Sequence, residues 1–158
     1  MKASTLAAIS AAISLVAVAA TTSVVLHFAP VLNGIAIIPG FADIRFALNR
    51  GVSFSLLAQD SPVGATVLTV GTAAVIVVLC LWAYRTTNPR LGMALGTIIG
   101  GALYNTVDRA LHGGVFDFLY LHLGAMPLFV CNTADIAITI GIIVMLLDSI
   151  WDARTTAP

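Results

Sequence analysis

Four long runs of apolar residues, separated by segments richer in polar and turn-forming residues, dominate the pattern of this chain. The runs cover residues 6–28, 63–84, 91 to about 107, and 128–150. Each is close to the length of about 20 residues that a helix needs to cross the hydrocarbon core of a bilayer. The pattern therefore predicts an all-α membrane protein, a single domain over residues 1–158, with four transmembrane helices and two outer segments, 29–62 and 108–127.

The segment between the first two predicted helices carries a different pattern. Residues 35–41 and 44–48 are rich in β-branched and aromatic side chains, and Pro39 and Gly40 interrupt them. This composition is typical of short strands joined by turns. We expect a small strand-rich platform at the membrane surface, whose edge an extended peptide can join by strand pairing. The alternative is an ordinary amphipathic connector.

Composition agrees with insertion in a membrane and narrows the classes of function. Hydrophobic residues make up 59% of the chain and charged residues 9%, and the mean hydropathy is +1.05. Seven basic and seven acidic residues cancel, so no net charge attracts nucleic acid, and we expect no nucleic-acid partner. All seven acids are aspartates.

The basic residues between the apolar runs predict the orientation, because short cytoplasmic loops are enriched in Lys and Arg. Four of them fall on one side and three on the other: Lys2, Arg85, Arg90 and Arg154 against Arg45, Arg50 and Arg109. This places both termini in the cytoplasm and the two longer segments on the outer, periplasmic face. The first run is longer than the apolar part of a cleaved signal peptide, which favours a retained helix over that alternative.

Two aspartates stand out as candidate chemical groups. Asp135 follows an apolar stretch, where a charged group at mid-bilayer costs about 2.5 to 3.5 kcal/mol, and such residues are functional candidates. Asp117 lies between two phenylalanines in the second outer segment. If the two carboxyls meet, they share a proton, so that one activates water and the other protonates a scissile carbonyl. For each aspartate alone, a hydrogen-bonded helix cap or a structural ion pair is equally compatible with the sequence.

The sequence predicts neither a metal site nor a cofactor. His112, Asp117 and His122 lie near one another along the chain, but they do not have a recognised ligand spacing. Cys80 and Cys131 belong to different apolar runs, which predicts neither a disulfide nor a zinc site.

Four segments, in this order, resemble the motifs of signal peptidase II, an aspartic protease family (A8) of bacterial membranes. Residues 49–55 are similar to Asn-x-Gly-x-Ala-Phe-Ser, 100–109 to Gly-Gly-Ala-x-x-Asn-x-x-Asp-Arg, 115–118 to Val-Val-Asp-Phe, and 132–135 to Asn-x-Ala-Asp. The resemblance implies that Asp117 and Asp135 are the catalytic pair. It also implies that a set of neighbours binds substrate or supports the pair: Asn49, Gly51, Asn105, Asp108, Arg109, Asn132 and Ala134.

By this resemblance, the expected activity is removal of the signal peptide from diacylglyceryl-modified bacterial prolipoproteins, with cleavage just before the lipidated cysteine. The implied location is the bacterial cytoplasmic (inner) membrane, with the active site near the outer face. The implied partners are the prolipoprotein substrate and membrane lipids, and the implied inhibitor is the cyclic peptide globomycin. We expect a monomer.

The chain departs from the family pattern in its first helix. The family's usual Asp and Lys late in that helix are replaced by Ala20 and Val24. The resemblance implies that these two positions lie beside the catalytic pair. In addition, Tyr104 replaces a glycine, and Cys131 replaces a phenylalanine. These departures leave open a paralogue that binds lipidated peptides, or assists another membrane protein, without cutting. A small transporter that uses Asp135 to carry protons or cations is a third hypothesis, although paired discontinuous helices and an internal repeat are lacking.

Overall fold

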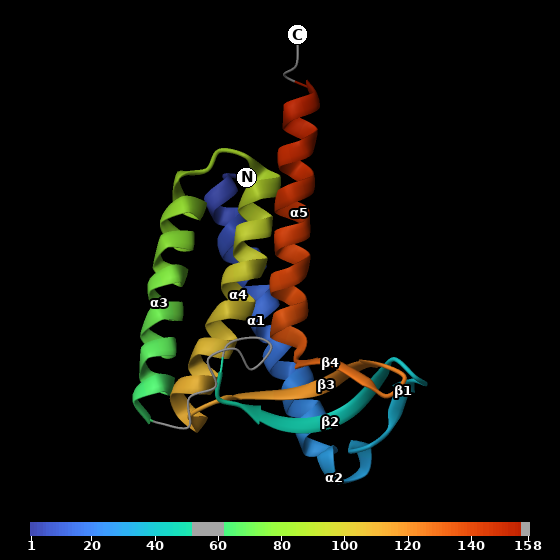
Figure 1. The fold of residues 1–158 in the computed structure, drawn as a ribbon. Helices are drawn as coiled ribbons and strands as arrows, with labels where there is room; N and C mark the ends of the chain where they lie inside the picture. Colours follow the sequence, from blue (N-terminus) through green and yellow to red (C-terminus); the bar gives the residue numbers. More distant parts are fainter. Residues whose placement is uncertain (52–61, 156–158) are drawn as a thin grey trace.

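The computed structural model describes residues 1–51 and 62–155, in which five helices and four strands form a helical bundle with a sheet at one end (Figure 1). In chain order the elements are α1 (Ala3–His27), α2 (Ala29–Leu32), β1 (Ala36–Ile38), β2 (Ala42–Asn49), α3 (Pro62–Arg85), α4 (Pro89–His112), β3 (Val115–Leu123), β4 (Met126–Cys131) and α5 (Thr133–Thr155). The predicted bundle with a strand-rich platform is thus confirmed in outline.

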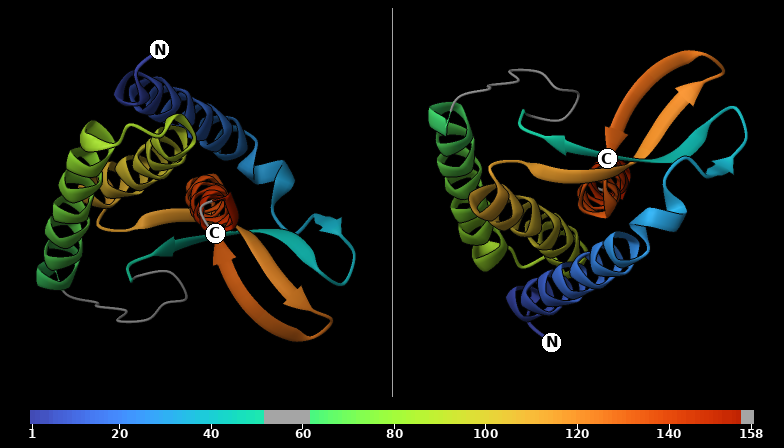
Figure 2. Two further views of the ribbon diagram at one scale, coloured as in Figure 1. Left: turned by 90° about the horizontal axis from the view of Figure 1, so that it is seen from above. Right: turned by 90° about the horizontal axis from the view of Figure 1, so that it is seen from below.

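Helix α4 lies at the centre of the bundle, with α1, α3 and α5 around it (Figure 2). Asn88 caps its start, where the side-chain oxygen accepts the backbone N–H groups of Arg90 and Leu91. Gly113, with φ of 70°, ends it in the left-handed conformation that glycine adopts at least cost. These two residues fix the length of α4, and hence the place where the chain turns into β3.

Glycines allow the helices to approach α4 closely. A Cβ atom added at Gly100 would lie 2.5 Å from the backbone oxygen of Ala11 in α1, and one added at Gly101 would lie 2.7 Å from that of Ala134 in α5. Small residues at helix interfaces bring backbones together in this way in membrane bundles. Gly100 and Gly101 therefore act as packing residues between α4 and its two neighbours.

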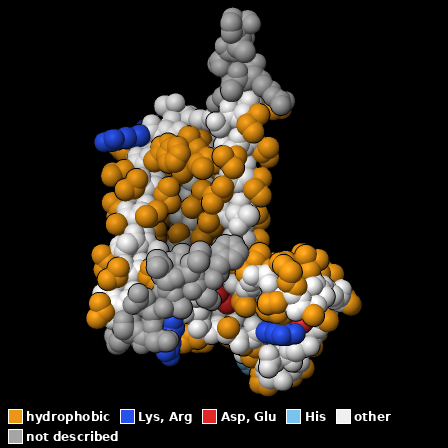
Figure 3. All heavy atoms as spheres, in the orientation of Figure 1, with side chains coloured by type: hydrophobic (Ala, Val, Ile, Leu, Met, Phe, Trp, Pro, Cys, Tyr) orange, Lys and Arg blue, Asp and Glu red, His pale blue; other side chains and the backbone are white. Residues whose placement is uncertain are grey.

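Three helices of the described chain are long and apolar enough to cross a membrane: Ala3–His27, Val63–Arg85 and Thr133–Trp151. Their surfaces expose many large apolar side chains (Figure 3), as expected of helices that face lipid. Helix α4, with 24 residues, is long enough to cross but less apolar than these three. It carries more polar and glycine residues because its neighbours, rather than lipid, cover most of its surface.

The sheet is antiparallel, in the order β1-β2-β3-β4, and projects to one side of the bundle (Figures 1 and 2). The start of α1, the α3–α4 connection and the end of α5 lie at the opposite end of the molecule (Figure 1). Both outer segments contribute strands, whereas the sequence predicted strands only between the first two helices.

Two predicted helix boundaries are corrected. Helix α4 continues to His112 rather than ending near Val107, so Asp108 and Arg109 are helical. Residues 128–131, predicted as the start of the last helix, belong to strand β4. The predicted outer segment 108–127 therefore contains the last turn of α4 and most of the β3–β4 hairpin. The part of the first motif from 52 to 55 lies outside the described residues.

Candidate active site

Asp117 is the third residue of β3 and is almost completely buried, with 2% of its surface exposed. Two asparagines from other elements hold its carboxylate. Asn49, the last residue of β2, donates to Oδ2 at 2.9 Å, and Asn132, at the start of α5, donates to Oδ1 at 2.8 Å. Both oxygens are therefore oriented by amide groups that converge from segments far apart in the sequence.

Asp135 lies in the first turn of α5 and forms a reciprocal cap with Asn132. The Asn132 side-chain oxygen accepts the backbone N–H groups of Ala134 at 2.7 Å and Asp135 at 3.2 Å. In return, Oδ2 of Asp135 accepts the backbone N–H of Asn132 at 3.1 Å. This is the geometry of a capping box, in which each side chain satisfies a backbone donor of the other residue. The helix-cap interpretation of Asp135 is therefore correct as far as Oδ2 is concerned.

The other oxygen of Asp135 is directed to the bundle centre. Asn105 of α4 donates to Oδ1 of Asp135 at 3.0 Å, and its own side-chain oxygen accepts the Asn132 amide at 3.1 Å. Asn132, with none of its surface exposed, thus donates to both aspartates: through its side chain to Asp117 and through its backbone to Asp135. The structure brings together the two carboxyls that the sequence singled out.

The orientation of the Asn132 amide follows from the cap. Backbone N–H groups only donate, so the side-chain oxygen of Asn132 has to face Ala134 and Asp135. The amide nitrogen then points away from α5, toward Asp117 and Asn105. One residue therefore fixes both the start of a helix and the position of a carboxylate on the sheet.

The environment of Asp117 raises its pKa from 3.8 to about 6. Burial is the largest cause, and the nearby negative charge of Asp135 adds to it. The hydrogen bonds from Asn49 and Asn132, and the positive charge of Arg109, act in the opposite direction. Because the pKa of Asp117 lies near 6, its carboxyl changes from protonated to ionised close to neutral pH.

Arg109 connects the site to the chain that leaves β2. Its Nη2 donates to the backbone oxygen of Gly51 at 3.0 Å, and the N–H of Gly51 donates to the Asn49 side chain at 3.0 Å. Arg109 is buried, and its Nε has no hydrogen-bond partner among the described residues. Its guanidinium supplies the positive charge that acts on Asp117. The contacts from Arg109 to Gly51 and from Gly51 to Asn49 thus fix the position of the Asn49 side chain.

The Asp108 side chain is hydrogen-bonded to the start of β3 and not to either carboxyl of the pair. Its Oδ2 accepts the backbone N–H of Phe116 at 2.8 Å, and Oδ1 lies 2.7 Å from Nδ1 of His112. These contacts fix the turn between α4 and β3, one residue before Asp117. Asp108 is therefore placed to position Asp117, which agrees with a supporting role in the site.

The other two histidines lie away from the carboxyl pair. Nδ1 of His122 lies 2.7 Å from the oxygen of Gly124, and Nε2 lies 3.3 Å from Asp43, at the far end of the sheet. His27 ends α1 beside Phe28. The hypothetical set of His112, Asp117 and His122 is therefore not assembled. The described residues contain no group of three His, Cys or Asp side chains suited to a metal ion.

The first helix reaches the site through a residue that sequence reasoning missed. Thr22 is 1% exposed, and its hydroxyl lies 3.5 Å from that of Thr133, two residues before Asp135. Ala20 and Val24, the positions of the missing charges, are exposed. The expectation that these positions would adjoin the carboxyl pair is not supported. The helical period was the available signal, because residues two apart on a helix lie on different faces.

Comparison with known proteins agrees with this geometry. A family model described as signal peptidase (SPase) II matches residues 7–151. A lipoprotein signal peptidase of Methylobacterium radiotolerans is 46% identical over 110 residues, which are 70% of this chain and 64% of that protein. Those of Methylorubrum extorquens and Beijerinckia indica are 43% and 40% identical, over 72% and 75% of this chain and 66% and 71% of theirs. The matched part thus spans slightly less than two thirds of the first two relatives.

The fold also has relatives among solved structures. A bacterial membrane enzyme solved at 2.3 Å superposes with a TM-score of 0.78 at 22% identity, over 96% of this chain and 91% of that one. A second such structure, at 1.9 Å, gives a TM-score of 0.73 at 22% identity, over 90% of each chain. At this identity, the likeness establishes a common fold.

Proposed function

The chain belongs to the signal peptidase II family, and we propose that it is an aspartic endopeptidase that removes the signal peptide from diacylglyceryl-modified bacterial prolipoproteins, cutting before the lipidated cysteine. The named relatives are lipoprotein signal peptidases. The observation that carries the proposal is the bridge by Asn132, which donates to the carboxylates of both Asp117 and Asp135. Capping of α5 explains the contact between Asn132 and Asp135. It does not explain why Asp117, a second buried carboxylate, is hydrogen-bonded to the same asparagine.

The proposed chemistry uses one proton shared by the pair. The ionised carboxyl takes a proton from a water molecule, and the water oxygen attacks the carbonyl carbon of the scissile peptide. The protonated carboxyl gives its proton to the carbonyl oxygen, so that the tetrahedral intermediate is neutral. On collapse of the intermediate the C–N bond breaks, and the protonated carboxyl gives its proton to the leaving amine nitrogen. The ionised carboxyl takes the proton of one hydroxyl as that oxygen re-forms the carbonyl, so the pair again holds one proton. Asn49, Asn105 and Asn132 hold the two carboxyls in place throughout.

The sheet offers a place for the extended substrate. Strand β1 pairs with β2 at Ala42 and Asp43, while β3 occupies the other side of β2 as far as Asn49. We place the substrate backbone along the edge of β2 that lies beyond β1, where strand addition would lead it toward Asn49 and the carboxyl pair. The proposed substrate-holding segment, residues 35–57, extends beyond the described residues at 52–57.

We further propose that α4 is a fourth crossing of the membrane. Its 24 residues give a length of about 36 Å at the ordinary helical rise, enough to span the core. It packs along α1 and α5, each apolar enough to cross, and a helix covered by other helices does not need an apolar surface of its own. Four crossings place both termini in the cytoplasm and the pair near the outer face of the bacterial inner membrane. The enzyme acts as a monomer among membrane lipids.

Complementation tests this function. The gene is expressed in a bacterium depleted of its own signal peptidase II, and prolipoprotein is followed by immunoblot. We expect mature lipoprotein to reappear and globomycin to block its appearance. Persistence of prolipoprotein, with the protein present in the membrane fraction, would contradict the proposal.

A further inference from the structure

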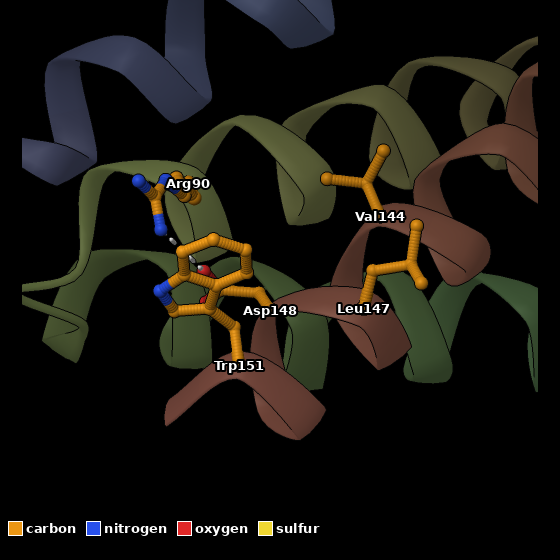
Figure 4. A pocket seen from close by; sticks show the side chains of 5 residues that line it. All are labelled: Arg90, Val144, Leu147, Asp148 and Trp151. Carbon is orange, nitrogen blue, oxygen red and sulfur yellow. Dashed lines mark ion pairs between the residues drawn. The ribbon is translucent and has the colours of Figure 1, made fainter. Parts of the chain in front are cut away.

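A second polar cluster lies at the end of the bundle opposite the carboxyl pair. A pocket of about 260 Å³ opens between the start of α4 and the last turns of α5. Its lining combines charged, aromatic and aliphatic side chains, namely Arg90, Val144, Leu147, Asp148 and Trp151 (Figure 4). None of these residues belongs to the proposed catalytic site, so the pocket needs an explanation of its own.

Asp148 is the feature that indicates a ligand. It is 92% buried, and ionisable residues on membrane helices are rare, face the interior and are normally paired or functional. Asn88 donates to its Oδ2 at 2.6 Å, but Oδ1 has no hydrogen-bond partner among the described residues. Nη1 of Arg90 lies 3.8 Å from Oδ1, too far for a hydrogen bond. Buried acceptors in native structures normally have a donor. Oδ1 has almost no exposed surface with Arg90 beside it, so an N–H or O–H group of a ligand reaches this oxygen when the exposed Arg90 side chain turns toward the ligand.

Arg90 supplies the opposite charge beside this oxygen. Its guanidinium lies against the ring of Trp151, with 6.0 Å between Cζ and the ring centroid, and its side chain is largely exposed. Figure 4 shows the Arg90 and Asp148 side chains meeting beside the Trp151 ring. Guanidinium groups bind phosphate through several N–H donors, and tryptophan is enriched where a bilayer meets water. The mouth of the pocket is therefore suited to a phosphate group.

Val144 and Leu147 continue the pocket along α5 toward the middle of the bundle (Figure 4). Both side chains are exposed, at 38% and 61%. An acyl chain can lie on such a surface without displacing protein. The order along the helix, from charged end to apolar wall, matches the order of groups in a phospholipid.

We propose that this pocket binds a phospholipid whose head group carries a primary amine, of the phosphatidylethanolamine class. The lipid phosphate accepts hydrogen bonds from Arg90, and the ammonium donates to Oδ1 of Asp148. The acyl chain lies against Val144 and Leu147. The two opposite charges of the pocket, 3.8 Å apart, complement the two charges of this head group. A head group without an N–H donor, such as choline, leaves Oδ1 without a hydrogen bond.

Lipid retention measured on the purified full-length protein by native mass spectrometry tests this proposal independently of cleavage. Phosphatidylethanolamine, phosphatidylcholine and phosphatidylglycerol with the same acyl chains are added separately. We expect the ethanolamine lipid to bind about tenfold more tightly than the choline lipid, the ratio for one hydrogen bond to a charged group. Asp148→Asn should remove this preference. Arg90→Gln should weaken retention of the ethanolamine and glycerol lipids alike.

Arg85→Gln is the matched control, because it removes an exposed positive charge from the end of α3 at the same end of the bundle, outside the pocket lining. It should leave the preference unchanged. Thermal unfolding of each variant shows whether it is folded, and the exposed Arg90 provides a test that does not disturb the buried Asn88–Asp148 contact. Equal retention of the ethanolamine and choline lipids by the parent would overturn the proposal. So would an undiminished preference in folded Asp148→Asn, or unchanged retention in Arg90→Gln.

Discussion

The side-chain amide of Asn132 donates a hydrogen bond of 2.8 Å to Oδ1 of Asp117. The two residues belong to different parts of the fold, since one caps a membrane helix and the other lies within a strand of the sheet. The same asparagine accepts the first backbone N–H groups of α5. The position of the proposed catalytic carboxyl of Asp117 on the sheet is therefore coupled to the start of the helix that carries Asp135.

Substitutions of Asn132 should separate its two roles. In Asn132→Ser the hydroxyl still caps α5 but no longer reaches Asp117 and Asn105 as an amide donor. We therefore expect cleavage about tenfold slower or more, and a loss of stability of about 1 to 3 kcal/mol because buried acceptors lose their donor. In Asn132→Ala the cap is lost as well, at a cost of about 1 kcal/mol. Cleavage rates and thermal unfolding in detergent measure the two effects. If the serine variant cuts as fast as the parent, the contact with Asp117 is structural only.

Asn49 should matter for the rate although it is not a reacting group. Asn49→Ala removes a 2.9 Å donor from Asp117, so we expect a drop in kcat/KM of about tenfold while the bundle remains folded. Asn33→Ala, at an exposed asparagine after α2, is the matched control and should behave like the parent. Equal rates for both variants at limiting substrate would show that Asn49 does not position the pair.

The raised pKa of Asp117 predicts the pH dependence of both activity and stability. The singly protonated pair loses its proton as the pH rises through about 6, so kcat/KM should fall above that pH. Unfolded Asp117 releases its proton near 3.8. Between these values the folded state binds more protons, and its free energy of unfolding decreases as the pH rises.

Two variants test the causes of this shift. Asp135→Asn removes the negative charge that raises the pKa of Asp117, so the pH range over which stability changes should move down. Asn49→Ala removes a hydrogen bond that lowers the pKa, so the range should move up. Thermal unfolding followed from pH 4 to 8 distinguishes the directions. A profile identical in all three proteins would contradict the assignment of the shift to Asp117.

Cleavage should be indifferent to chelators. The four oxygens of the carboxyl pair accept hydrogen bonds from Asn49, Asn105 and Asn132. The two histidines nearest to Asp117 in sequence contact other residues: His112 contacts Asp108, and His122 contacts Gly124 and Asp43. We therefore expect the same rate with and without EDTA. Loss of activity in EDTA that zinc restores would instead support water activated by a metal ion.

The apolar runs predicted the four long helices, and three of these four are long and apolar enough to cross a membrane. They misplaced the start of the last helix, since residues 128–131 are as apolar in strand β4 as in a helix. Asn132 with Asp135 three residues later was the missed signal. This spacing is that of a capping box, and it predicts a helix that begins at Thr133, as observed.

The candidate site was predictable in its residues but not in its contacts. Asp117 and Asp135 lie 18 positions apart, and only the β3–β4 hairpin, missed from the sequence, brings them together. The face of α1 that meets the site was also misplaced. The resemblance to the family motif predicted that Ala20 and Val24 lie beside the carboxyl pair. In the structure Thr22, on another face of α1, lies against Thr133.

The central claim is that Asp117 and Asp135 act together on the scissile peptide. The most direct measurement is cleavage of a purified diacylglyceryl-modified prolipoprotein by the parent, Asp117→Asn, Asp135→Asn and Asp43→Asn, each shown to be folded. Asp43 is a matched control, because it lies on the same sheet but pairs with Arg45 and His122 away from the site. We predict no detectable cleavage by either Asp117→Asn or Asp135→Asn and normal cleavage by Asp43→Asn. Near-normal cleavage by a folded Asp117→Asn or Asp135→Asn would contradict the account.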